Sequence, residues 1–306
     1  MENKILIISG PTASGKSQLA FNLSEFHDIA IINADSLQIY EGLPILSSQP
    51  SQLEQKKVKH FLYSILKPQE SSSVAMWLKL VKSSVEQCRK ENKLPVIVGG
   101  SGMYISKLVE GISEIPPIDE SIRIEASELF EGINREDFIE ELVKLGEEKE
   151  RALKLDKHRL IRSYEVLKQT KKSIFYWQSQ PITKIFDEKD FLHININPNR
   201  ETLYQNCNSR FEKMLELGAI QEVDELLKQE ILDDKQITKT LGFYEISDFL
   251  NNRITKEESV VIATQKTRNY AKRQLTWFRN QLPNKAVCED VVSAFNLIKK
   301  NYGNRG

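Results

Sequence analysis

The chain has 306 residues, with 43 Lys or Arg and 43 Asp or Glu, so its formal net charge is zero. This length allows one large or two modest domains with a buried core. The balanced charge gives no global sign of a nucleic-acid partner, although a local basic stripe can coexist with an acidic segment. The three cysteines are widely spaced and form no CxxC pair, which argues against a zinc site and a disulfide framework.

The chain also lacks the sequence features of secreted and membrane proteins. It begins without a basic-then-apolar signal region, and no apolar run approaches the roughly 18 residues that a membrane span needs. Its separated cysteines fit a reducing compartment. We therefore expect a cytoplasmic protein with no membrane partner.

Short apolar runs and helical stretches alternate along the first part of the chain. Residues 4–9, 29–34 and 94–98 resemble buried strands, and residues 73–91 form one of the helical stretches between them. This alternation predicts a parallel sheet that is covered on both faces. In such a sheet, ligands bind at the carboxyl ends of the strands.

The first strand leads directly into the sequence GPTASGKS, which matches the P-loop pattern G-x-x-x-x-G-K-[ST]. Its members are Gly10, Pro11, Thr12, Ala13, Ser14, Gly15, Lys16 and Ser17. Backbone N–H groups of such a loop surround a phosphate chain, while Lys16 adds charge and Ser17 can supply an oxygen to Mg²⁺. The next helix directs its positive dipole end to the same point. Its apolar face predicts packing on the sheet, through Leu19, Ala20, Leu23 and Phe26.

Polar residues follow the second strand, and glycines follow the third. Asp35 could hold Mg²⁺ through water, accept a proton from a nucleophile, or cap a helix or turn. Gln38 has the amide that can pair with an adenine edge. Residues 99–102 read GGSG, which suits either close approach of a ligand or a tight turn.

Nucleotide-specific motifs beyond the P-loop are missing. Apart from residues 29–35, no apolar run ends in Asp as a Walker B strand does, and no Asn-Lys-x-Asp sequence for guanine is present. The P-loop is therefore not tied to a motor or a switch GTPase. It could hold a nucleotide or a different diphosphate.

The character of the chain changes near residue 112. Residues 119–150 are Glu-rich and helical in pattern, further helices are predicted over 153–170, 200–227 and 257–282, and one strand over 191–196. We predict an α/β fold with a P-loop NTPase-like core and a parallel sheet, plus a mostly helical insertion domain. The predicted divisions are 1–112 for the first part of the core, 113–190 for the insertion, and 191–306 for helices that return to the core.

Two of the predicted helices carry basic side chains along one side. Arg159 and Arg162 share a face of the first, and residues 256–282 hold six Lys or Arg against two Glu, with Tyr270 and Trp277 on a common face. Such helices suit a phosphate backbone and splayed bases, or are simply solvated surfaces. The aromatic run 175–177 is predicted to lie in a core.

Together these segments resemble one family, the tRNA dimethylallyltransferases, also called tRNA isopentenyltransferases. The matching segments are GPTASGKS at 10–17, INADSLQIY at 32–40, VGGSGMYISKLVEG at 98–111, HRLIRSYEV at 158–166, LYQNCNSRFEKMLELGAIQEV at 203–223, TLGFYEI at 240–246 and TRNYAKRQLTWFR at 267–279. The resemblance implies a monomer that transfers a dimethylallyl group from dimethylallyl diphosphate to N6 of adenosine 37 in the anticodon stem-loop of tRNA, beside adenosine 36.

The resemblance also assigns roles to individual residues. Asp35 would be the base, Ser101 and Arg210 would be further catalytic residues, and the P-loop would hold the pyrophosphate together with Mg²⁺ at Ser17. The adenine would leave its stack by base flipping. The positions that would contact tRNA are Asp35, Ser36, Leu37, Gln38, Ser101, Arg123, His158, Arg159, Leu160, Ile161, Arg162, Thr240, Leu241, Gly242, Phe243, Tyr244 and Glu245.

Several positions depart from the family pattern, mostly by losing positive charge. Residues 46–50 read LSSQP where the family usually has GTAKP, Phe61 replaces a His, Tyr244 replaces a basic residue and Asn206 replaces an Arg, while Ser101 replaces a Thr. Three other functions stay open: a small-molecule kinase using ATP, a prenyltransferase acting on free AMP, and a non-catalytic RNA-binding protein.

Overall fold

The computed structural model describes residues 4–229, 235–282 and 285–302. Small parts of two predicted divisions lie outside the described residues: 1–3 of the division 1–112, and 230–234, 283–284 and 303–306 of the division 191–306. The chain forms two compact units. One comprises Met1–Val109 and Ile185–Gly306, and the other comprises Glu110–Lys184. None of the helices in the described ranges is long and apolar enough to cross a membrane.

Within the described residues, the first unit contains a six-stranded sheet in the order β3-β2-β4-β1-β7-β8. Its strands are β1 (Ile5–Ser9), β2 (Ile29–Asn33), β3 (Lys59–Phe61), β4 (Leu94–Gly99), β7 (Phe191–Ile196) and β8 (Ala286–Cys288). Every pairing in this sheet is parallel. The predicted fold class, an α/β P-loop core with a parallel sheet, is therefore confirmed. The sequence predicted four of these strands, β1, β2, β4 and β7, and missed the two short edge strands β3 and β8.

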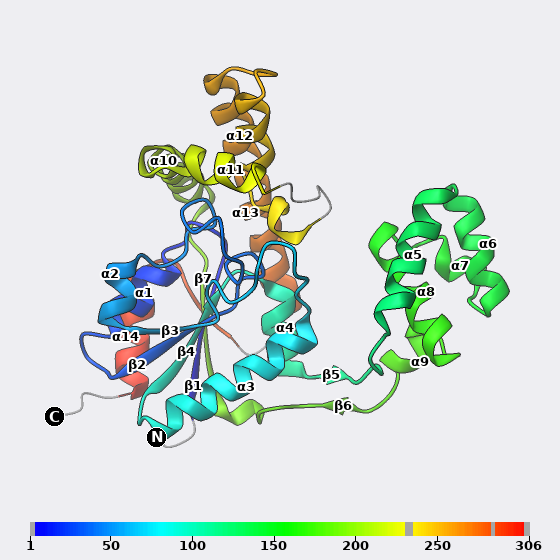
Figure 1. Ribbon diagram of the computed structural model, residues 1–306. Coiled ribbons are helices and arrows are strands. Elements are labelled where there is room, and N and C mark those ends of the chain that lie inside the picture. Colours follow the sequence, from blue (N-terminus) through cyan, green and yellow to red (C-terminus); the bar gives the residue numbers. More distant parts are fainter. Residues whose placement is uncertain (1–3, 230–234, 283–284, 303–306) are drawn as a thin grey trace. The chain divides into compact units, whose positions relative to one another are not determined.

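Helices cover both faces of this sheet (Figure 1). On one face, α1 (Lys16–Leu23) and α14 (Val291–Tyr302) bury Leu19, Leu23 and Ile298 against alternate strand residues. On the other face, α3 (Val74–Lys90) contacts β2 and β4 and buries Trp77. The parallel strands are apolar throughout because both faces are covered.

The predicted apolar face of the first helix was wrong at one position. Helix α1 ends at Leu23, and the Phe26 side chain is 53% exposed, where its ring meets the edge of Phe295. The predicted helix over 200–227 is also two helices, α10 (Arg200–Leu217) and α11 (Ala219–Leu227). They are separated by Gly218, whose φ of 110° ends the first helix in the left-handed region.

Helices α10 and α11 form a layer with α12 (Phe243–Leu250) and α13 (Lys256–Gln281) above the carboxyl end of the strands (Figure 1). Leu203 and Cys207 of α10 and Ala271 of α13 pack together, with Ala13 of the P-loop against them. The helical layer is thus fixed directly onto the predicted phosphate site. The remaining elements of this unit are α2 (Gln52–Lys57), α4 (Gly102–Glu110), η1 (Glu188–Asp190) and η2 (Gln236–Lys239).

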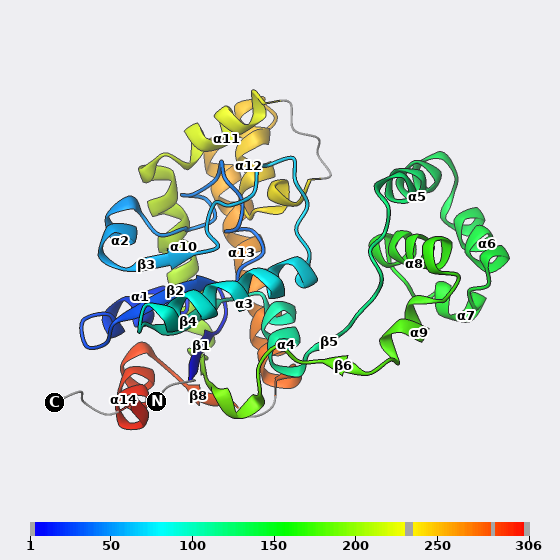
Figure 2. The same ribbon diagram turned by 60° about the horizontal axis from the view of Figure 1, so that its bottom comes forward.

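The second unit is mostly helical (Figure 2). It contains α5 (Glu120–Gly132), α6 (Arg135–Leu145), α7 (Lys149–Ala152), α8 (Lys157–Thr170) and α9 (Ile174–Gln178), and the strands β5 (Ile112–Ser113) and β6 (Ile182–Thr183) pair antiparallel. Its core includes Phe138, Leu142 and Leu160. The predicted core position of residues 175–177 was wrong, since α9 has no buried residue and Tyr176 is 43% exposed.

Candidate active site

The carboxyl ends of β1, β2 and β4 bring the three predicted loops to one edge of the sheet. The strand register aligns Ser9 with Gly99 across β1 and β4. The loop after β4 then closes on the loop after β2, because the Ser101 N–H donates to the Ala34 carbonyl at 3.2 Å. A Cβ atom at Gly99 would lie 2.1 Å from that carbonyl oxygen, so the close approach requires glycine.

The loop formed by residues 10–17 has the conformation expected of a phosphate-binding loop. Gly15 has a φ of 90° and is the N-cap of α1, so the amino end of this helix faces the loop. The Lys16 ammonium folds back and donates to the Pro11 carbonyl at 2.5 Å. The buried Ser14 hydroxyl has no hydrogen-bond partner among the described residues, which leaves an unsatisfied polar group within the loop.

Two half-buried cations, Lys16 and Arg210, lie beside this loop. Burial lowers the pKa of Lys16 to about 7, with nearby Arg210 acting in the same direction and Asp35 opposing it. Burial likewise lowers the pKa of Arg210, and Asp35 again opposes the shift. One nearby carboxylate against two desolvated cations leaves positive charge unbalanced, which favours binding of an anion.

Arg210 comes from α10 and reaches the P-loop from above. Its guanidinium donates to Thr12 Oγ1 at 3.2 Å and also to the Ser48 hydroxyl. Asn206, one turn earlier on the helix, donates to the Ala13 carbonyl at 3.2 Å. Two of the positions that depart from the family pattern therefore lie beside the P-loop: Asn206 contacts the loop itself, and Ser48 contacts Arg210.

Asp35 is half-buried at the end of β2. Its Oδ1 accepts from Leu37 N at 3.0 Å, and its own N–H donates to the Asn33 side chain at 2.8 Å. These contacts form a local turn, so the capping role is present and fixes the carboxylate in place. Burial raises the pKa of Tyr270, and the negative charge of Asp35 raises it further. The Asp35 carboxylate therefore acts on a side chain of the neighbouring pocket.

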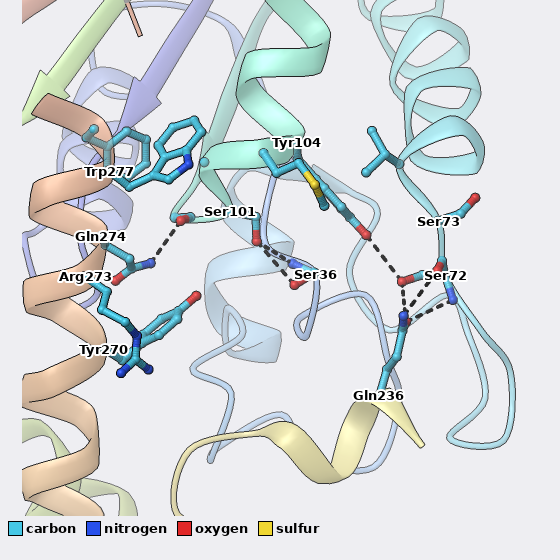
Figure 3. Close-up of a pocket in the computed structure, with 15 residues that line it drawn as sticks. Ser36, Ser72, Ser73, Ser101, Tyr104, Gln236, Tyr270, Arg273, Gln274 and Trp277 are labelled. Carbon is cyan, nitrogen blue, oxygen red and sulfur yellow. Dashed lines mark hydrogen bonds between the residues drawn. The ribbon is translucent and has the colours of Figure 1, made fainter. Parts of the chain in front are cut away.

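That pocket is a cavity of about 460 Å³ in the first unit (Figure 3). Tyr104, Tyr270 and Trp277 provide aromatic walls, and Ser36 and Ser101 provide polar groups. Gln274 also lines the cavity, with its amide hydrogen-bonded within the protein. The Ser101 hydroxyl accepts from Ser36 N at 2.9 Å. A flat ring with polar edges would find both stacking surfaces and hydrogen-bond partners here.

Sequence reasoning missed part of this lining. Tyr270 and Trp277 share a face of α13 and both line the pocket, but Gln274, between them on that helix, was not singled out. A polar residue three or four positions from each aromatic was the available signal. Gln236 and Ser72, hydrogen-bonded to each other at 2.7 Å, carried no such signal because they come from two separate loops.

Some predicted contact residues are engaged within the protein. Both hydrogens of the Gln38 amide are donated, to the carbonyls of Ser47 and Ser48 at 2.9 Å each. In the segment 240–245, Glu245 is buried and forms an ion pair with Lys266. Tyr244 is the most exposed residue of that segment. The other residues are buried or half-buried: Thr240, Leu241, Gly242, Phe243 and Glu245.

The predicted RNA contacts of the second unit lie on α5 and α8. Arg123 and Arg159 are exposed and face their neighbours Glu120 and Asp156 at 3.7 Å and 3.6 Å, and Arg162 pairs with Glu165 at 2.7 Å. His158 is exposed, Ile161 is half-buried and Leu160 is fully buried in the unit core.

The candidate magnesium site offers few protein oxygens. Ser17 is exposed at the start of α1, but no group of three or more His, Cys, Asp or Glu side chains suited to a metal occurs among the residues that the structure describes. A metal here would therefore take most of its ligands from a bound diphosphate and from water, as Mg²⁺ commonly does.

Comparison with known proteins places this arrangement in a family. The family model described as IPP transferase matches residues 38–281. The tRNA dimethylallyltransferase of Wolbachia pipientis wMel is 40% identical over 302 residues, covering 97% of this chain and all of the relative.

Solved structures agree. The tRNA isopentenylpyrophosphate transferase of Bacillus halodurans has a TM-score of 0.67 at 28% identity and covers 97% of this chain and 96% of its own. A eukaryotic dimethylallyltransferase acting on tRNA shares the fold, with a TM-score of 0.77 at 23% identity, covering 98% of this chain and 76% of its own. This chain belongs to the IPP transferase family.

Proposed function

We propose that this protein is an enzyme that transfers a dimethylallyl group from dimethylallyl diphosphate to N6 of adenosine 37 in tRNA, and that it acts as a monomer. The observation that carries the proposal is the excess of half-buried positive charge at the P-loop, beside a half-buried carboxylate and an aromatic pocket. Two relatives that align with 97% and 98% of this chain carry the name tRNA dimethylallyltransferase.

The P-loop would bind the diphosphate of the donor. Lys16 and Arg210 supply the compensating charge, and the unsatisfied Ser14 hydroxyl is available as a further hydrogen-bond donor. The diphosphate is the leaving group of the donor, and its negative charge grows as the C–O bond breaks, so cations fixed at that point stabilise the transition state more than the ground state.

The loop also fits a magnesium ion held chiefly by the donor. Ser17 is the residue that would contribute an oxygen, and its exposed hydroxyl at the amino end of α1 leaves room for water ligands. Bound there, Mg²⁺ would neutralise part of the diphosphate charge.

The adenine would enter the aromatic pocket with its amino group toward Asp35. The N6 lone pair forms a bond to C1 of the dimethylallyl group, the C1–O bond breaks, and its electron pair leaves with the diphosphate. The N6 proton passes to the Asp35 carboxylate, which is held by Leu37 N and Asn33 within reach of the pocket. Ser101, hydrogen-bonded to Ser36 N, would orient the ring.

An incubation of the purified protein with Mg²⁺, dimethylallyl diphosphate and unmodified tRNA carrying adenosines 36 and 37 tests this function. We expect N6-dimethylallyladenosine in the digested tRNA by mass spectrometry. Parallel incubations contain AMP as the acceptor, or ATP with no tRNA. Product on AMP alone would support the free-nucleotide prenyltransferase instead, and ATP turnover without tRNA would support a kinase.

A further inference from the structure

The side chain of Gln274 is a buried amide that the proposed chemistry does not use. It is 6% exposed and lies on α13 between Tyr270 and Trp277, on the face that lines the pocket (Figure 3). Its Oε1 accepts from Thr12 N at 2.8 Å, and its Nε2 donates to the Gly100 carbonyl at 2.9 Å. One side chain from a third element therefore joins the P-loop to the loop after β4.

The orientation of this amide is fixed by its two partners. One partner is an N–H group and the other is a carbonyl. Rotating the amide by half a turn would place Nε2 against the Thr12 N–H and Oε1 against the Gly100 carbonyl, so both hydrogen bonds would be lost. The fit is also tight, since a Cβ atom at Gly100 would lie 2.5 Å from Gln274 Nε2. The amide thus sets a defined spacing between the two loops.

The hydrogen bonds continue beyond Gln274 on both sides. On the side of the P-loop, Thr12 Oγ1 accepts from Arg210, one of the two half-buried cations. On the acceptor side, Ser101 follows Gly100 directly and accepts from Ser36 N, next to Asp35. The network therefore runs from the charges that would hold the diphosphate to the groups that would meet the adenine.

We infer that Gln274 is a positioning residue that fixes the distance between the donor site at the P-loop and the acceptor site at Asp35. The inference rests on the proposed function. In the proposed function each substrate binds mainly to its own loop, so the alignment of C1 with N6 depends on the spacing between the two loops. A misplacement of about 1 Å can cost roughly 100-fold in rate even when binding is retained.

The test is a Gln274→Met variant, which keeps the length of the side chain and removes both hydrogen bonds. We expect the single-turnover rate of prenyl transfer to fall by about 30- to 100-fold. The dissociation constants for tRNA and for an unreactive thio analogue of dimethylallyl diphosphate, each measured alone, should stay within about threefold. Gln265→Met is the matched control, because Gln265 is an exposed glutamine of the same helix, and its rate should not change.

A Gly100→Ala variant approaches the same amide from the other side. Its new methyl group would displace Gln274 Nε2, so we expect the same loss of rate with substrate binding retained, and thermal unfolding shows whether either variant is folded. A rate within about threefold of the unmodified protein in the folded variants, or a loss explained by weaker binding of one substrate, would overturn the inference. Absence of product with the unmodified protein would instead reject the proposed function, and this inference with it.

Discussion

The sheet edge of the first unit and the surface of α8 in the second both carry positive charge, but in different environments. At the sheet edge, Lys16 is desolvated and its pKa falls to about 7. On α8, the Arg159 side chain is 73% exposed and faces Asp156, and Arg162 pairs with Glu165. Burial makes the first set sensitive to one bound anion, whereas solvent and salt screen the second.

The difference indicates two kinds of function. A desolvated charge stabilises a developing negative charge strongly because no water must reorganise around it. Exposed arginines bind a phosphate backbone weakly and additively, and their contribution falls with salt. The sheet edge is therefore suited to bond breaking, and α8 is suited to holding a long polyanion.

The largest effect expected is at Asp35. Asp35→Asn removes the proton acceptor while keeping the side-chain size, so kcat should fall by about 100- to 10,000-fold with the tRNA dissociation constant little changed. Asp28→Asn is the control, since Asp28 precedes the same strand at its opposite end and pairs with Lys93. Steady-state kinetics measures kcat, and a separate binding titration measures the tRNA dissociation constant. Weaker tRNA binding with an unchanged kcat would contradict the role of Asp35 as the base.

The next effect is at Lys16. Lys16→Met removes one of the two half-buried cations, so affinity for dimethylallyl diphosphate should fall by roughly 10- to 100-fold. Isothermal titration calorimetry with the unreactive analogue measures it, and Lys93→Met at the other end of the sheet serves as the control. Unchanged donor affinity would remove the P-loop from donor binding.

A smaller effect is expected from the two arginines of α8, exposed Arg159 and half-buried Arg162. The double variant Arg159→Ala, Arg162→Ala should weaken tRNA binding by about tenfold at low salt and reduce the slope of log K against log salt by about two. Catalysis from the bound complex should not change. Lys144→Ala is the control, because Lys144 is exposed on α6 of the same unit and pairs with Glu141. An unchanged salt slope would exclude α8 from the tRNA interface.

The smallest effect concerns pH. With its pKa near 7, Lys16 of the free protein is half charged at neutral pH, and a bound diphosphate raises that pKa by favouring the charged form. Donor binding should therefore take up a proton above pH 7, and affinity should fall by about fivefold between pH 7 and pH 8. Titrations in two buffers of different ionisation enthalpy measure the uptake, which should vanish in Lys16→Met and would persist there if another group were responsible.

The sequence predicted the local parts of this site better than its long-range parts. The P-loop and the strand before it were readable because glycine spacing and apolar runs are local signals. The ion pair between buried Glu245 and exposed Lys266 and the position of Gln274 were not, since both depend on how α12 and α13 pack against other elements. The edge strands β3 and β8 have only three residues each, too few for a periodic pattern.

The order of strands has a consequence for how the protein is made. β1 lies between β4 and β7, and Ile7 pairs with His193, so the second neighbour of β1 emerges from the ribosome only after the whole second unit. Contacts of such high sequence separation form slowly, while a compact helical unit can fold from its own local contacts. The P-loop is thus among the first functional segments synthesised, whereas β7, one of the two strands that flank β1, is added only after the second unit.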